Sequence, residues 1–134
     1  MLAVAGRVAQ MDLLVEFFTE HEIFIERERF AAFDRYFKGA TFYECAQRTR
    51  RPFDGIAGDP VRSCAPIFRM NPRTYSAEVS AEAIAAIRGI PGLSVTSSLP
   101  EAVDITVASA TKGAAAAWLA GHLGTSLAGG ARLR

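Results

Sequence analysis

A lysine at the start of a predicted helix is the residue of this sequence with the clearest chemical potential. Thr111, Lys112 and Gly113 follow a β-rich run and open an amphipathic segment, so Lys112 falls in the first helical turn. The helix macrodipole opposes a cation there, at little cost if the amine points into water. A helix N-terminus also favours phosphate, which the amine can meet at the same place. Lys112 is therefore either a solvated surface lysine or a phosphate contact.

Three arginines that are close to one another in the sequence, and one histidine, are weaker candidates for binding a substrate. Arg48, Arg50 and Arg51 precede Pro52, in a stretch typical of a loop. They can contact a phosphate or a sugar acid, or they can form a solvated basic loop. His21 lies in a predicted hairpin turn, where it either reaches a substrate or is simply exposed.

Cysteine and histidine do not predict a metal site. Cys45, Cys64, His21 and His122 are scattered along the chain without the spacing of metal ligands. Two cysteines also do not make a disulfide framework. We expect no metal ion to bind to this chain.

The elements that position these residues alternate between strands and helices. Residues 13–18 and 23–26 are β-rich runs around four polar residues and predict a hairpin. Aromatic residues at helical spacing predict an amphipathic helix over residues 29–38, ended by Gly39. Residues 40–64 show loop and turn chemistry and no clear element. The remaining predicted elements are the end of a helix over residues 1–10, a strand centred on 67–70 and ended by Asn71-Pro72, a helix capped by Ser76 or Ser80, strands over 93–97 and 103–107, and a helix from 111 to about 123.

This order predicts an α+β fold, with helices packed on one face of a mostly antiparallel sheet. Residues 103–107 alternate strictly between apolar and polar side chains. We expect the apolar face of this strand, Val103, Ile105 and Val107, to meet the apolar faces of two helices, Phe30, Phe33, Ile84 and Ile87.

Composition excludes several classes of protein. The 134 residues suffice for one domain, half are apolar and 22% are charged. A formal net charge of +1 argues against a nucleic-acid partner. No apolar run approaches the ~20 residues of a membrane span, and the first residues do not have the pattern of a signal peptide. We expect a cytoplasmic protein without membrane contact.

The segment from residue 97 to 124 resembles the join between cap and core in the Cof-like, type IIB phosphatases of the haloacid dehalogenase superfamily. The matching positions are Asp104-Ile105-Thr106-Val107, Lys112-Gly113, Trp118-Leu119 and His122-Leu123-Gly124. Residues 13–26 and 29–38 also resemble the opening hairpin and first helix of this family's C2-type cap. The resemblance covers about residues 1–124.

The resemblance implies a catalytic role for Lys112 and a Mg²⁺ ion in the complete family enzyme. In the family, this lysine neutralises the nucleophilic aspartate and the phosphoryl group. The family's Asp-x-Asp-Gly and Gly-Asp-x-x-Asn-Asp motifs have no counterpart here: Asp54-Gly55 lacks the earlier aspartate, and Gly58-Asp59-Pro60 lies in the wrong place. Phosphoryl transfer needs a nucleophile and a metal as well as a cation, and Lys112 supplies only the cation.

The resemblance therefore predicts three segments and a function. Residues 1–10 would be the end of a core or linker helix, residues 11–108 the α+β cap domain, and residues 109–134 a truncated return to the core. The complete enzyme would hydrolyse small phosphorylated metabolites, and this chain alone would be inactive. The alternative is a non-enzymatic α+β module that binds a ligand or a partner. We expect residues 109–134 to be loosely docked or to self-associate through the exposed C-terminal helix.

Overall fold

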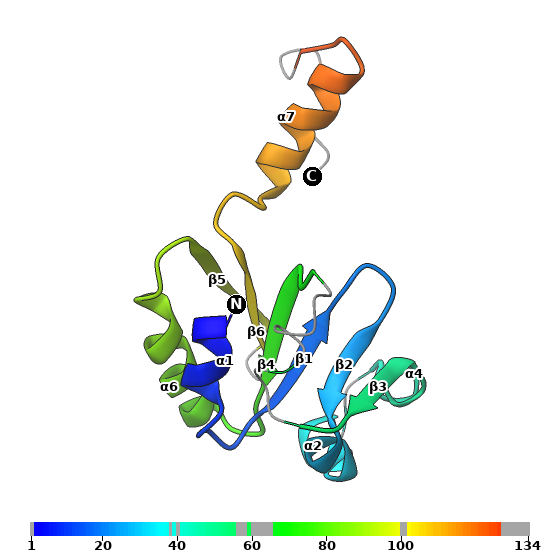
Figure 1. The fold of residues 1–134 in the computed structure, drawn as a ribbon, viewed down its shortest axis with the longest axis vertical. Helices are drawn as coiled ribbons and strands as arrows, with labels where there is room; N and C mark the ends of the chain where they lie inside the picture. The colour runs from blue at the N-terminus through cyan, green and yellow to red at the C-terminus, as the bar shows by residue number, and fades with distance from the viewer. Residues whose placement is uncertain are drawn as a thin grey trace.

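A six-stranded sheet with the strand order β3-β2-β1-β4-β6-β5 forms the centre of the molecule (Figure 1). The computed structural model describes residues 2–37, 39, 41–55, 59, 66–99 and 102–126. Neighbouring strands are antiparallel except β2 and β3, which are parallel. The strands are β1 (Leu14–Phe18), β2 (Ile23–Glu26), β3 (Arg50–Phe53), β4 (Arg69–Arg73), β5 (Leu93–Leu99) and β6 (Ala102–Val107). The predicted α+β fold with a mostly antiparallel sheet is confirmed.

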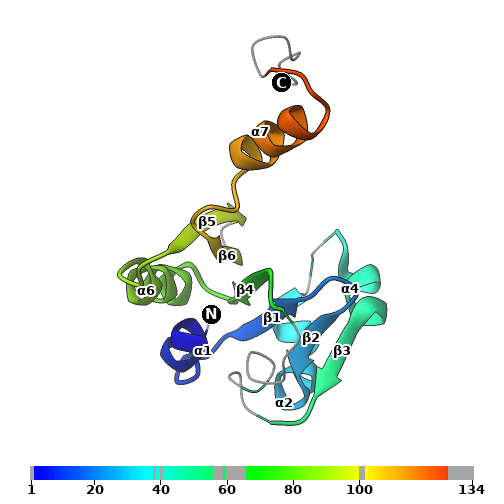
Figure 2. The same cartoon turned by 45° about the horizontal axis from the view of Figure 1, so that its top comes forward.

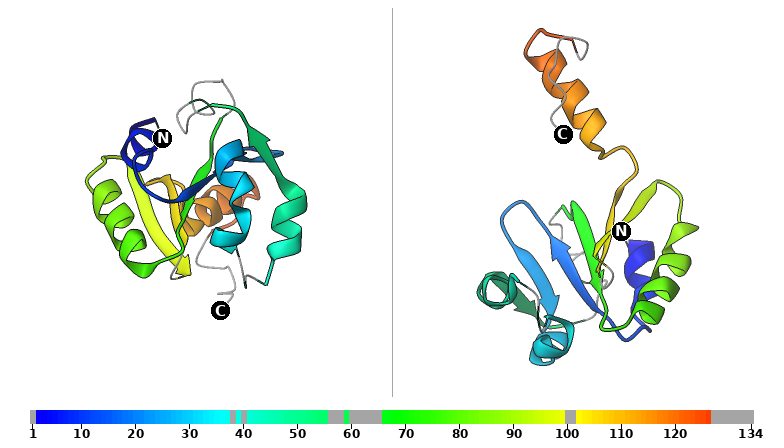
Figure 3. Two further views of the ribbon diagram at one scale, coloured as in Figure 1. Left: turned by 90° about the horizontal axis from the view of Figure 1, so that it is seen from below. Right: turned by 180° about the vertical axis from the view of Figure 1, so that it is seen from behind.

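Helices lie on both faces of this sheet, although the sequence predicted them on one face. Helices α1 and α6 lie side by side on one side, and α2 and α4 lie on the other (Figure 3). The described helices are α1 (Leu2–Val8), α2 (Arg27–Ala31), α3 (Phe33–Phe37), α4 (Tyr43–Thr49), α6 (Ala77–Arg88) and α7 (Lys112–His122). Two faces are covered because β1 is buried on both, as the burial of the adjacent Leu14 and Val15 demonstrates.

The first core lies between the sheet and helices α1 and α6. The buried residues of its sheet face come from β1, β4 and β6, and the helices add apolar side chains that include Ile84 and Ile87, as predicted. The fully buried members are Val4, Ala5, Val8, Leu13, Val15, Phe17, Met70, Ala83, Ile87, Val103 and Ile105. Val107 does not follow the prediction, because it lies at the end of β6 and is 48% exposed.

The second core is an aromatic cluster on the opposite face, and it contains Phe30 and Phe33, which were predicted to face β6. Phe33 stacks on Phe37 with ring centroids 4.2 Å apart, over Leu14 and Ile25 of the sheet. The predicted helix over residues 29–38 is two short helices, α2 and α3, separated at Ala32. Gly39 has φ +82°, a left-handed conformation that glycine adopts without strain, and Lys38 lies outside the described residues.

Strand β4 continues through Asn71 and Pro72, where the sequence predicted it to end. Pro72 lies opposite Val15 of β1, and Asn71 lies opposite Glu16. On the other side, β4 pairs with β6 through Arg69, Met70 and Arg73. Proline has no N–H to donate and is normally found at sheet edges, which is why the prediction placed the strand end here.

Residues 41–55 contain two elements that the sequence did not reveal. Helix α4 is followed directly by β3, which lies at the edge of the sheet beside β2. Arg50 and Arg51 therefore belong to a strand and not to a loop. Proline at position 52 is compatible with this edge location, where one side of the strand needs no partner. Cys64, Gly58 and Pro60 lie outside the described residues.

Asp12 connects the start of β1 to the aromatic helices. Its carboxylate accepts hydrogen bonds from the guanidinium of Arg35 at 2.7 Å, and from the hydroxyls of Tyr36 at 2.9 Å and Tyr75 at 3.0 Å. Arg29 donates to the same carboxylate at 3.2 Å. The hydrogen bond from Tyr36, together with the smaller effects of Tyr75 and the two arginines, holds the pKa of Asp12 below its ordinary value of 3.8.

Helix α7 stands away from the sheet, as Figures 1 and 2 show. None of its residues is buried, and Trp118 is 70% exposed. Three backbone hydrogen bonds shape the turn that leads into it: Ala108 N–H donates to Gly92, Ala110 to Val107 and Thr111 to Ser109, at 2.8, 2.9 and 3.0 Å. No helix within the described residues is long and apolar enough to span a membrane.

Candidate functional site

Lys112 is the first residue of α7, as the sequence predicted for its helix. Thr111 caps the helix: its Oγ1 accepts a hydrogen bond from the backbone N–H of Ala114 at 3.0 Å. The lysine is exposed. It therefore lies just beyond the end of β6, with its amine free to meet an anion from solvent.

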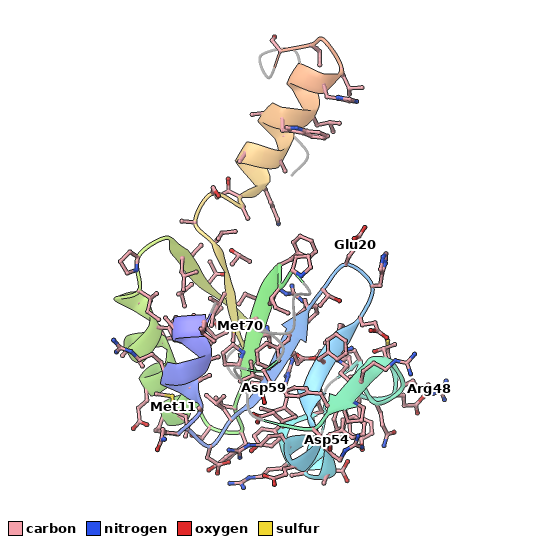
Figure 4. The ribbon with its side chains drawn as sticks, viewed as in Figure 1. Met11, Glu20, Arg48, Asp54, Asp59 and Met70 are labelled. Carbon is pink, nitrogen blue, oxygen red and sulfur yellow. The ribbon has the colours of Figure 1, made fainter. Side chains whose placement is uncertain are left out.

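His21 lies in the turn between β1 and β2, as predicted. Its side chain is 81% exposed, and its Nε2 is 3.8 Å from a carboxylate oxygen of Glu20, which Figure 4 shows at the tip of the hairpin. Because β1 and β6 run in the same direction across β4, this turn and the start of α7 lie at the same end of the sheet. His21 and Lys112 therefore share an end of the molecule, without a contact between them.

Arg48 and Arg51 lie on the far edge of the sheet from Lys112. Arg48 is exposed in α4 and points outward from the molecule (Figure 4). Arg51 is 68% exposed, and its Nε is 3.4 Å from a carboxylate oxygen of Glu22. The structure brings neither of them near Lys112, since three strands separate β3 from β6.

Arg50 is a buried structural residue. Its guanidinium is 10% exposed and contacts the carboxylate of Glu16, which is 2% exposed, with Nη2 and Nε 2.6 and 2.7 Å from Oε1. Arg73 approaches the other carboxylate oxygen from β4, with its Nε 4.0 Å away. Its guanidinium also lies over the ring of Phe37, 4.5 Å from the centroid. Arg50 is thus occupied by the fold and is not available to a substrate.

A group of polar side chains lies on the face of the sheet opposite α1 and α6, and it was not predicted from the sequence. Cross-strand register places Phe18, Arg69, Thr106 and Ser94 in one row and Glu16, Asn71, Asp104 and Thr96 in the next. The polar residues that alternate with Val103 and Ile105 were the only signal of this surface. Arg69 gave no signal, because its position on the same face depends on pairing between distant strands. We call Phe18, Ser94, Arg69, Asn71, Asp104 and Thr106 the polar face.

The centre of the polar face is an ion pair held by an amide. Arg69 Nη1 is 3.5 Å from Asp104 Oδ1, and the Arg69 guanidinium lies over the ring of Phe18, 3.9 Å from its centroid. Asn71 Nδ2 donates to Asp104 Oδ1 at 2.9 Å. Asn71 is 6% exposed, and its Oδ1 is buried without a hydrogen-bond partner.

No metal centre is found in the part of the chain that the structure describes. There, no three side chains among aspartate, glutamate, histidine and cysteine come close enough to hold an ion. Asp54 is paired with Arg27, its Oδ1 2.6 Å from the arginine Nε, and this pairing holds the pKa of Asp54 below its ordinary value. The nearest match to the family's acidic motif is therefore engaged in a surface ion pair.

The fold is shared with haloacid dehalogenase-like hydrolases of known structure. A haloacid dehalogenase-like hydrolase from B. subtilis is 15% identical, with a TM-score of 0.65 over 92% of this chain and 49% of its own. A subclass IIB sugar phosphatase of the HAD superfamily is 18% identical, with a TM-score of 0.63 over 94% of this chain and 44% of its own. A haloacid dehalogenase-like hydrolase from Bacteroides thetaiotaomicron is 14% identical, with a TM-score of 0.66 over 90% and 42%.

These comparisons show that the chain shares the fold of haloacid dehalogenase-like hydrolases, the family that its sequence resembles. No family model and no curated protein matches the sequence. The chain spans less than half the length of each of the three structures it matches.

Proposed function

We propose that this chain is the cap of a phosphatase of the haloacid dehalogenase type, together with the first segment that leads from the cap to the catalytic core. The observation that carries this proposal is the position of Lys112, at the first turn of a helix that follows β6 after a short turn and has no buried residue. The resemblance of the sequence around Lys112-Gly113 to the family's lysine segment supports the same role for this residue. The segments 1–10, 11–108 and 109–134 are the proposed divisions, although α1 packs with α6 in the first core.

The substrate class is a small phosphorylated metabolite, and the complete enzyme uses Mg²⁺. One of the similar structures is a sugar phosphatase of subclass IIB, which supports this class. The described residues do not themselves fit a Mg²⁺ ion, because they contain no cluster of three candidate ligands. No step through the metal is therefore assigned to this chain.

Lys112 would stabilise negative charge on the phosphoryl group. A helix N-terminus offers backbone N–H groups to an anion, and a primary amine at its first residue adds a full positive charge. Neither group attacks phosphorus or holds a metal. This chain alone would thus bind phosphate weakly and turn over no ester.

A binding module without enzymatic activity is the second candidate. It is favoured by the state of Asp54, the residue nearest to the family's acidic motif, which is paired with Arg27. In this reading the sheet and its two helical layers serve only to present a binding surface.

The test is a panel of sugar phosphates and a chromogenic phosphate ester, assayed on the purified chain with Mg²⁺, alongside a measurement of phosphate binding. We expect no turnover, and we expect Lys112→Ala to weaken phosphate binding severalfold while Arg88→Ala, an exposed arginine on α6, leaves it unchanged. Turnover that copurifies with the protein and is lost in Lys112→Ala would refute the predicted inactivity. Phosphate binding that is unchanged in Lys112→Ala would favour the binding module.

A further inference from the structure

The two outer strands of the sheet differ in how well they are protected against pairing with another chain. The sheet ends at β3 on one side and at β5 on the other. Strand β3 carries the exposed Arg51 and Pro52, and natural sheets commonly block an edge with charged residues or proline. Strand β5, Leu-Ser-Val-Thr-Ser-Ser-Leu, contains neither a charged residue nor a proline. The edge formed by β5 is therefore not blocked by its sequence.

The backbone of β5 has hydrogen-bonding groups that point away from the sheet. Next to the start of β5, the N–H of Ala108 donates to the carbonyl of Gly92 at 2.8 Å, so this carbonyl faces β6. Successive residues of an antiparallel strand alternate in direction, so the N–H and C=O groups of Leu93 and Val95 point outward. Within the described chain, no strand pairs with that outer side. The register with β6 is regular over residues 93–97, so this segment is an open template for another strand.

The side chains of β5 are compatible with those of a second β5 strand. Leu93 and Val95 lie on the face that carries α6, and both pack in part against the first core. Ser94 and Thr96 lie on the opposite face. In an antiparallel pair of two β5 strands centred on Val95, each Val95 faces the other, and Ser94 of one strand faces Thr96 of the other. Such β-branched and hydroxyl pairs stabilise a sheet, and no charge meets a like charge.

We propose that this chain forms a symmetric dimer through β5, in which two copies join their sheets antiparallel across a two-fold axis at Val95. This residue is the middle of the regular segment 93–97. The N–H of Val95 donates to the carbonyl of Val95 in the second copy, and the same bond forms in return, as a two-fold axis requires. The interface contains no residue that the proposed function uses, so the two proposals stand or fall separately.

This dimer does not use helix α7. Leu93 lies opposite Val107, so α7 follows the end of β6 that is next to the start of β5. A two-fold axis perpendicular to the sheet reverses the direction of the second β5, and the two α7 helices therefore stand at opposite ends of the joined sheet. Trp118 on α7 stays as exposed in the dimer as in the monomer. Dimerisation through β5 is thereby distinguishable from self-association through α7.

The test is sedimentation velocity of the whole chain over a range of concentrations, with tryptophan fluorescence measured on the same samples. Main-chain pairing over so short a segment makes an interface at the small end of the known range, so we expect a weak dimer with a Kd on the order of 100 μM. Trp118 is the only tryptophan, and its emission should not shift as the dimer forms. A chain that stays monomeric well above this concentration would overturn the proposal, as would a blue shift that follows dimerisation.

Variants of β5 with a matched control locate the interface. Val95→Pro removes an N–H that points outward, leaves the pairing with β6 intact and should raise the Kd about tenfold. Thr96→Lys places like charges diagonally across the axis and should raise the Kd severalfold, while a mixture of Thr96→Lys and Thr96→Glu should restore dimerisation. His21→Lys adds the same charge at the exposed hairpin turn and should leave the Kd unchanged.

Dimerisation that is unchanged in Val95→Pro and in Thr96→Lys would overturn the proposal. A mixture of the two Thr96 variants that associates no better than either variant alone would also overturn it, because opposite charges across the axis must attract. If Val95→Pro fails to fold, the Thr96 variants carry the test, since Thr96 is exposed and its side chain is not part of either core.

Discussion

Glu16 lies between two arginines in the interior, and replacing it with glutamine tests whether this buried charge cluster holds the sheet to the aromatic helices. Glutamine keeps the shape of the side chain and removes its charge. Arg50 and Arg73, whose side chains are 10% and 7% exposed, would then be left without the carboxylate. Breaking a buried pair by removing one partner costs about 3–5 kcal/mol, a large part of the roughly 5–15 kcal/mol that stabilises a domain.

The assay is unfolding by urea and by heat, followed by circular dichroism. For a chain of this size the loss corresponds to a fall in Tm on the order of 10–20 °C. The matched control is Glu22→Gln, since Glu22 pairs with Arg51 in solvent, where the two side chains are 46% and 68% exposed. Such a surface pair contributes about 0–1 kcal/mol. Equal losses of stability in the two variants would refute the reasoning.

Three further predictions concern Asp12, the helix caps and α7. Asp12 has a lowered pKa, so the stability that its carboxylate provides is complete above the ordinary pKa of 3.8 and is lost as the pH falls through the lower pKa of the folded state. Asp12→Asn should therefore lower the free energy of unfolding at neutral pH and make the decline of that free energy in acid shallower. Urea titrations across pH measure both effects. Ser76→Ala should reduce global stability by about 1 kcal/mol, because Ser76 caps α6 over the first core, whereas Thr111→Ala should reduce only the helicity of α7 and leave Tm unchanged. Amides of residues 115–123 should exchange with deuterium much faster than those of β6, because an isolated helix of 11 residues is only marginally stable in water. Equal protection of the two segments in a proven monomer would contradict this expectation. Protection of α7 that rises with protein concentration would indicate self-association through this helix.

The sequence revealed the elements whose patterns are local. The hairpin of β1 and β2 and the strand β6 follow from patterns within a few residues. Capping preferences limited the start of α6 to Ser76 or Ser80, and the structure has Ser76 as the cap. The position of Lys112 at the start of α7 belongs to the same class. Each of these features depends on neighbours in the chain, which is the information that a sequence carries directly.

The features that were missed depend on contacts between distant segments. The residues around Arg50 are typical of a basic loop, and they do not indicate its ion pair with Glu16, which lies 34 positions earlier in the chain. Pro72 predicted the end of a strand, but β4 continues through it because Pro72 lies opposite Val15 of β1. Asp104 and Arg69 form the centre of the polar face only once β4 and β6 pair. At Arg50 and Pro72, tertiary pairing overrode a local preference for a loop or a strand end.

Because Lys112 is the first residue of α7, a rotation in the turn before this helix moves its far end much more than it moves Lys112. Its 11 residues span about 16 Å at roughly 1.5 Å per residue. A rotation of about 20° in the turn would sweep the far end, with Leu123, through roughly 6 Å over that length. The same rotation would hardly displace Lys112, which three backbone hydrogen bonds of the turn hold near the end of β6. A change of angle in this turn can therefore bring the exposed apolar side chains of α7 against another surface, while Lys112 stays close to the end of β6.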